Sequence, residues 1–346
     1  MDIIQELSQE LSLQQAIALV VKIHERDSKT SVSKRFGMYP IEDWDSFQRM
    51  KKLEAAYWQA DEVDFTQDKN DFDALTSDER KPLIRAFGFF AVGDGSIASM
   101  LAYQMILRAD TFEKEAFYTV QLNNERIHGE TYGKMIYTLI QDPKERESVF
   151  ESVERVPSVK AMNDYIESCF LSSELKDVYI GMAAAEYLLF TPLFCIIFWY
   201  RVYKPGKLKS VIFSNELIAK DEACHCENGC ANYVRLPEDQ KYDIKELHDI
   251  IAKVVTLVHG FCDELFSDIT LEGLTSEKTK AYVQYVADDL LWRVDAPALY
   301  KTANPYPWMK FTSLIPKTNF YEGQVGEYSR FNVASSLGIE EDDGLF

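Results

Sequence analysis

Two Glu-x-x-His units in this 346-residue chain restrict its fold more than any other feature. In a helix, side chains three positions apart lie on one face, so each unit offers a carboxylate and an imidazole together. Two further acids, Asp94 and Glu186, interrupt helical stretches that are otherwise apolar, where an isolated charge would be costly. Four helices that bring these groups into one core would form a site for two metal ions. The six predicted ligands are Asp94, Glu125, His128, Glu186, Glu222 and His225.

The ligand types indicate which metals would bind. One buried acid alone could be structural, and one Glu-x-x-His can arise by chance, so the prediction rests on their combination. Four carboxylates and two imidazoles suit iron or manganese better than zinc, which takes fewer ligands and often thiolates. The carboxylates balance the charge of two divalent ions. Such a pair can bind and reduce dioxygen, which magnesium and calcium cannot do.

The cysteines suggest a second metal site that we reject. Cys224, His225, Cys226 and Cys230 lie close together in sequence. Consecutive helix positions point about 100° apart, however, so these side chains cannot converge on one zinc ion. We interpret Cys226 and Cys230 as packing residues, and all six cysteines as reduced and mostly buried thiols.

Composition favours one large helical domain. The chain is 47% hydrophobic, has only 15 glycines and 11 prolines, and contains no Gly/Ser/Pro-rich linker. Its formal charge of −19 argues against nucleic acid as a partner. Asp2, Glu6 and Glu10 precede the first apolar stretch, where a signal peptide would carry basic residues. We therefore expect a cytoplasmic protein.

Helical periodicity dominates the sequence, and no stretch alternates as a strand would. Thr76 and Glu79 match a capping box at the start of the second predicted helix. Two prolines at Asn304–Pro307 end the helical core. The predicted helices span residues 42–60, 77–110, 112–140, 158–171, 175–203, 210–234, 238–270 and 276–300.

The two ends of the chain differ from this core. The last residues are acidic, poor in apolar side chains and tipped by Leu345 and Phe346. Such a tail could dock into a partner's groove or simply be a solvated terminus. The N-terminal residues could form an amphipathic helix against the body or a mobile extension. The predicted division is an extension at 1–33, a helical metal-binding domain at 34–316 and a flexible tail at 317–346.

Residues 181–200 are long and apolar enough to span a membrane. Glu186 and Pro192 lie inside this run, and a carboxylate at that depth is costly in lipid. A helix in the middle of a bundle is hydrophobic on all sides in the same way. We therefore predict a core helix, and no membrane as a partner.

Tyr132 is expected near the metal ions, because it follows His128 by four positions on the same helix face. Phe190, Phe194 and Ile218 lie four or eight positions from predicted ligands. They could form a dry sheath around the phenol, although ordinary core packing produces the same spacing.

These motifs closely resemble those of the radical-generating small subunit of class I ribonucleotide reductase, of the eukaryotic or viral type. The resemblance runs from about residue 34 to the C-terminus. It implies an all-α, ferritin-like helical bundle with a flexible C-terminal tail. The segments that carry it are RFGMYPIE (35–42), YWQADEVDF (57–65), FFAVGDG (89–95), NERIHGETY (124–132), FSNELIAKDEACH (213–225) and KTNFYEGQVGEYSR (317–330).

The resemblance implies a role for each candidate residue. A di-iron centre would react with dioxygen and oxidise Tyr132 to a stable radical; manganese, with an activating flavoprotein, is the alternative. Trp58 and Asp221 match residues that conduct the electron and proton toward the surface. Tyr328 matches the tyrosine that passes the radical onward. One ion would be bound by Asp94, Glu125 and His128 and the other by Glu186, Glu222 and His225, with bridging carboxylates.

The resemblance also implies partners and a function. A homodimer would dock on a large subunit through the C-terminus ending at Phe346, and that subunit would supply the nucleotide site. The chain would then be the small subunit of ribonucleoside-diphosphate reductase, which makes deoxyribonucleotides for DNA synthesis. Two departures are Lys220, where arginine is usual, and the ending GIEEDDGLF. Neither touches a predicted ligand.

Two alternatives remain. A ferritin-like di-iron oxidase or oxygenase would share the six ligands, but it would not need Trp58, Asp221 or Tyr328. An inactive paralogue that stabilises an active small subunit should have lost ligands, and this chain has all six.

Overall fold

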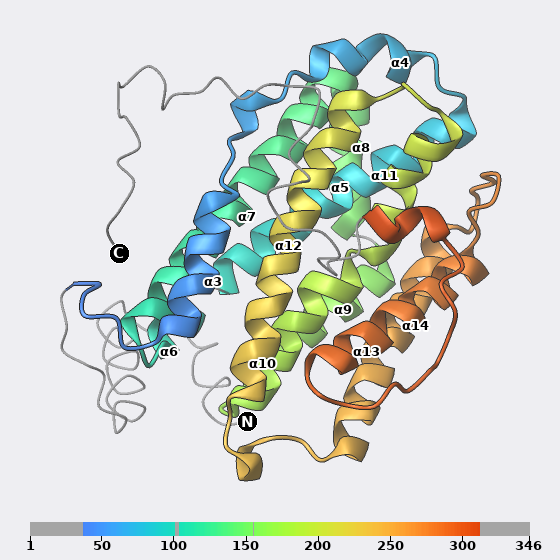
Figure 1. Cartoon of the computed structure of the whole chain (residues 1–346). Helices are drawn as coiled ribbons and strands as arrows, with labels where there is room; N and C mark the ends of the chain where they lie inside the picture. Colours follow the sequence, from blue (N-terminus) through green and yellow to red (C-terminus); the bar gives the residue numbers. More distant parts are fainter. Residues whose placement is uncertain (1–36, 101–103, 155, 312–346) are drawn as a thin grey trace, which may run out of the picture. The chain divides into compact units, whose positions relative to one another are not determined.

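Long helices dominate the residues that the computed structural model describes, which are 37–100, 104–154 and 156–311 (Figure 1). Within these residues the only β-type pairing is a single bridge between Leu271 and Leu274. The predicted all-α class is therefore confirmed. The long helices are α3 (Trp44–Ala55), α5 (Ser77–Met100), α7 (Phe112–Leu139), α9 (Pro157–Phe170), α10 (Leu175–Ala184), α11 (Thr191–Tyr203), α12 (Lys209–Val234), α13 (Ile244–Leu265) and α14 (Ser276–Arg293).

The helices that carry the predicted ligands pack on one another. Helices α5 and α12 both pack on α7, and α12 also packs on α10 and on the π-helical turn η4 (Ala185–Leu189). Helix α3 contacts both α7 and α12, while α13 packs on α9 and α14 (Figure 1). The sequence therefore folds so that the ligand-bearing faces meet in the interior of the bundle.

The apolar stretch Leu175–Tyr203 is a core element. It is long and apolar enough to cross a membrane, but 94% of its most apolar window is buried inside the protein. The predicted helix bounds of 175–203 are confirmed, but within them the π-helical turn η4 separates α10 from α11. Pro192 lacks the amide hydrogen that would continue the helical bonding pattern. The Thr191 hydroxyl instead donates to the Tyr187 carbonyl at 2.7 Å.

Two capping boxes determine where helices begin. The Thr76 amide donates to the Glu79 carboxylate at 3.0 Å and the Glu79 amide to the Thr76 hydroxyl at 3.4 Å, which confirms the predicted start of α5. In the same way, the Asp243 amide donates to the Glu246 carboxylate at 3.1 Å and the Glu246 amide to the Asp243 carboxylate at 2.8 Å. Helix α13 therefore begins at Ile244, not at the predicted residue 238.

Other predicted boundaries were also wrong. Helix α3 ends at Ala55 instead of residue 60, and α14 ends at Arg293 instead of residue 300. Shortly after α14, Asp295 has a φ of 58°, outside the right-handed helical region. Helix α8 (Pro143–Glu154) was not predicted, because charged residues dominate its sequence. It packs on α5 and α9. The short α-helices among the described residues are α4 (Lys69–Asp73) and α6 (Ile106–Arg108), and the short 3-10 helices are η1 (Ala60–Glu62), η2 (Phe65–Asp68), η5 (Glu238–Gln240) and η6 (Pro307–Phe311).

All six cysteines lie within the described residues and are free thiols, and all but Cys224 are buried. The sulfur atoms of Cys226 and Cys230 are 3.9 Å apart, one turn apart on α12. Both side chains are in the core, so the interpretation of these two as packing residues is confirmed.

Candidate metal centre

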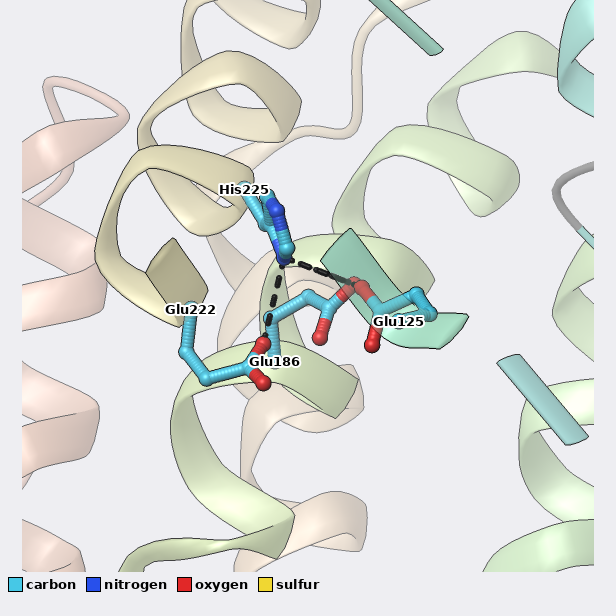
Figure 2. A group of neighbouring side chains, drawn as sticks. All are labelled: Glu125, Glu186, Glu222 and His225. Carbon is cyan, nitrogen blue, oxygen red and sulfur yellow. Dashed lines mark hydrogen bonds and ion pairs between the residues drawn. The ribbon is translucent and has the colours of Figure 1, made fainter. Parts of the chain in front are cut away.

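Four of the predicted ligands converge at one buried point (Figure 2). Glu125 comes from α7, Glu186 from η4, and Glu222 and His225 from α12. One ligand atom from each lies within 4.8 Å of the others. His128, one turn after Glu125 on α7, adds a second imidazole to the cluster.

The carboxylates of Glu125 and Glu222 each contact both imidazoles. His225 Nδ1 is 3.0 Å from Glu125 Oε1 and 3.2 Å from Glu222 Oε2. His128 Nδ1 is 3.1 Å from Glu222 Oε1 and 3.5 Å from Glu125 Oε2. Of the two imidazoles, the Glu186 carboxylate approaches only that of His225, at 3.9 Å. Glu125 and Glu222 thus occupy the positions from which a carboxylate can bridge two ions.

The donor set fits two metal ions. Both carboxylate oxygens of Glu125, Glu222 Oε1 and His128 Nδ1 are buried and make no hydrogen bond within the described part of the chain. Buried charges of this kind need a compensating partner. The imidazole nitrogens and carboxylate oxygens lie 3.0 to 3.5 Å apart, close enough for a nitrogen and an oxygen to hold one ion together. Both imidazoles present Nδ1 to the carboxylates.

The imidazoles and carboxylates of the cluster shift one another's pKa values. Burial lowers the pKa of His225, but Glu125 and Glu222 outweigh it and raise the pKa to about 9. Burial also lowers the pKa of His128, yet Asp221 and the two glutamates raise it well above its usual value. Burial raises the pKa of Glu222, while the two imidazoles bring it far below normal. Metal ions would therefore replace protons on the imidazoles.

The structure also brings Trp58 and Asp221 to this site. The Trp58 indole donates to Asp221 Oδ2 at 2.8 Å, and His128 Nε2 lies 3.1 Å from the same oxygen. The indole and imidazole rings stack at 6.1 Å. Because Nδ1 of His128 faces the ligand carboxylates, Nε2 is the nitrogen that donates to Asp221. Asp221 thus lies outside the ligand set and orients a ligand.

Tyr132 is completely buried, and its hydroxyl donates to Asn215 Oδ1 at 2.7 Å. Asn215 Nδ2 donates in turn to the Val211 carbonyl at 2.8 Å, which fixes the orientation of the amide. The ring of Phe90 is parallel to the Tyr132 ring at 4.6 Å. The phenol is therefore shielded from bulk solvent, and the hydrogen bond to Asn215 orients its hydroxyl.

Two of the three residues predicted to surround Tyr132 reach it through Phe90, which was not predicted. Phe190 and Phe194 pack on Phe90 at 5.3 and 5.0 Å, so they join the Tyr132 cluster through that ring. Ile218 is fully buried on α12, three positions after Asn215.

Three functional candidates were missed: Phe90, Asn215 and Gln121. Gln121 Nε2 donates to Glu186 Oε1 at 2.7 Å. Phe90 and Gln121 each lie four positions before a predicted ligand, and Asn215 lies seven before Glu222. The same helical spacing that identified the ligands could have found them.

Some of the predicted features lie outside the described part of the structure. The backbone of Asp94 lies in α5, but its side chain is outside the described part of the structure. Tyr328, the docking residues that end at Phe346 and the extension at 1–33 lie outside the described residues.

Comparison with known proteins gives a consistent result. The family model "Ribonucleotide reductase, small chain" matches residues 35–305. A small subunit of ribonucleoside-diphosphate reductase from Arabidopsis thaliana is 35% identical over 323 residues, covering 92% of this chain and 95% of the relative. Human ribonucleoside-diphosphate reductase subunit M2 is 34% identical over 305 residues, covering 88% of this chain and 77% of the human protein.

Solved structures share the fold. The dimanganese(II) NrdF of Streptococcus sanguinis aligns with a TM-score of 0.73 at 20% identity, over 81% of this chain and 99% of that one. The Rnr4 homodimer of Saccharomyces cerevisiae aligns with a TM-score of 0.71 at 21% identity, over 84% and 95% of the two chains.

Proposed function

Because this protein belongs to the ribonucleotide reductase small-chain family, we propose that its buried cluster holds two iron ions and that Tyr132 becomes the radical used in ribonucleotide reduction. The observation that carries this proposal is the convergence of carboxylates and imidazoles from α7, η4 and α12 beside a sequestered tyrosine. The bound metal pair would supply the reduction of dioxygen. Its ligands would be Asp94, Glu125, His128, Glu186, Glu222 and His225.

The protein's own side chains would then protect and connect the oxidised tyrosine. Phe90 excludes water from the Tyr132 ring, and Asn215 holds the phenol hydroxyl. Asp221 keeps His128 in the tautomer that leaves Nδ1 free for a metal ion. The contacts run from His128 to Asp221 and, through a hydrogen bond, from Asp221 to Trp58. A relay of electrons and protons away from the cluster would need such a connected series.

The test is an electron paramagnetic resonance (EPR) spectrum of metal-free protein that has been reconstituted with ferrous iron and air. A tyrosyl signal together with turnover after addition of the large subunit is expected. Iron binding without a radical would favour either a di-iron oxidase or manganese loading with a flavoprotein. Failure to bind metal would favour the inactive paralogue.

We further propose that the protein is a homodimer that forms through α7. A groove of about 670 Å³ between α5 and α7 reaches the predicted ligand Glu125. Leu122 and Gly129 also line it, and a Cβ atom added to Gly129 would meet nothing within 4 Å. A second copy on this face would cover the groove that Leu122 and Gly129 line. Sedimentation should give 79.8 kDa, twice the 39.9 kDa of one chain, and a single-chain mass would contradict the dimer.

The partner is proposed to be the large subunit, bound through residues 340–346. The support is the acidic tail tipped by Leu345 and Phe346. Deleting these seven residues should leave metal content and radical yield unchanged, but lower turnover at a fixed large-subunit concentration at least about tenfold. Undiminished turnover would rule out docking by the tail. Tyr328→Phe in the full-length protein separates docking from radical relay. It should bind the large subunit normally but show no turnover.

A cytoplasmic location is also proposed. Six free thiols, most of them buried, are typical of a reducing compartment. Cell fractionation would test this, and recovery in a secreted or organellar fraction would contradict it.

A further inference from the structure

Glu186 is held differently from the other described ligands. It is not part of a Glu-x-x-His unit, and it lies in a π-helical turn where the regular helical hydrogen bonding changes register. Its closest described imidazole contact is His225 Nδ1 at 3.9 Å, whereas Glu125 and Glu222 lie within 3.0 to 3.5 Å of both imidazoles. The position of its carboxylate therefore depends on a contact other than the imidazoles.

Gln121 provides such a contact from a neighbouring helix. It lies one turn before Glu125 on α7 and is completely buried. Its Nε2 donates to Glu186 Oε1 at 2.7 Å, across 65 positions of sequence. A carboxylate only accepts hydrogen bonds, so the amide nitrogen must be the group that faces it.

The chemistry of glutamine suits this task. A lysine or arginine at the same place would neutralise Glu186 and compete with a metal ion for it. An aliphatic side chain would remove this donor from the carboxylate. A neutral amide orients one oxygen of Glu186 while the carboxylate keeps its negative charge for a cation.

We propose that Gln121 is a positioning residue for the second metal ion, the one bound by Glu186, Glu222 and His225. It acts through Glu186 and touches no ion itself. This role rests on the proposed function, because it requires two ions in the cluster.

The test uses Gln121→Met, which keeps the length of the side chain and removes the donor. Manganese(II) is titrated into metal-free full-length protein, and the EPR signal of the free hexaaqua ion reports binding without any turnover. Wild type should bind two ions. The variant should bind the first ion as wild type does and the second ion about 10- to 100-fold more weakly.

Further variants separate positioning from a general structural effect. Glu186→Ala should bind only one ion, and adding Gln121→Met to it should not weaken that ion further. Asn232→Leu is the matched control, because it removes another buried amide that donates across helices, to Tyr118 at 3.0 Å. It should bind two manganese ions normally. Gln121→Asn serves as a second test variant if the methionine protein does not fold, because its amide is one methylene too short to reach Glu186.

The outcomes are distinct. Normal binding of both ions by Gln121→Met, or equal weakening in the Glu186→Ala background, would overturn the role of Gln121. Fewer than two ions bound by wild type would overturn the two-metal proposal itself, and this role with it.

Discussion

Tyr132→Phe is expected to lose the tyrosyl EPR signal and all ribonucleotide reduction while still binding two metal ions. Phenylalanine keeps the aromatic ring that stacks on Phe90 but has no phenol to oxidise. The substitution leaves Asn215 Oδ1 buried without the hydroxyl, which should cost about 1 to 3 kcal/mol of stability. EPR after reconstitution, metal analysis and thermal unfolding would measure the three effects.

Tyr118→Phe is the matched control. Tyr118 lies on the same helix, is buried to the same degree, and accepts a hydrogen bond from the Asn232 amide. The control should lose similar stability and retain the full radical signal. A tyrosyl signal of normal yield in Tyr132→Phe would place the radical elsewhere in the protein.

Asp221→Asn should reduce turnover with the large subunit at least about 100-fold, even when metal is saturating. The carboxylate oxygen Oδ2 lies within hydrogen-bonding distance of both Trp58 and His128. An amide carries no charge to stabilise the imidazole and offers one accepting atom where the carboxylate offers two. We therefore also expect metal affinity to fall about 10- to 100-fold. A metal titration and a turnover assay would report these two effects separately.

The relay makes a stricter prediction for a pair of variants. If Trp58 and Asp221 act in one relay, Trp58→Phe combined with Asp221→Asn should be no slower than the slower single variant. Multiplied losses would show that the two residues act independently. Asp288→Asn is the control, since Asp288 accepts bonds only from Leu299, Tyr300 and Lys301 among the described contacts.

Helix geometry explains why much of the metal centre could be predicted. The i, i+3 spacing places Glu125 beside His128 and Glu222 beside His225 whatever the rest of the protein does. The cost of burying Glu186 in an apolar stretch indicated that it has a partner, and the structure supplies partners in the cluster and in Gln121.

The remaining features depend on how helices meet. Glu125 and Glu222 each face both imidazoles because α7 packs on α12. No local sequence pattern encodes this packing. The same holds for Phe90, which reaches Tyr132 from α5. The π turn at 185–189 also escaped prediction, because its sequence has ordinary helical periodicity and only Pro192 marks the change.

The hydrogen bond between Trp58 and Asp221 joins residues that are 163 positions apart in the sequence. Packing of α7 on α12 shortens the loop that this contact must close and so lowers its entropic cost, which means that the contact should form after that packing. A newly made polypeptide could then assemble its metal ligands before it can exchange electrons with the surface. On the proposed function, this order of folding would insulate the metal cluster until the contact between Asp221 and Trp58 has formed.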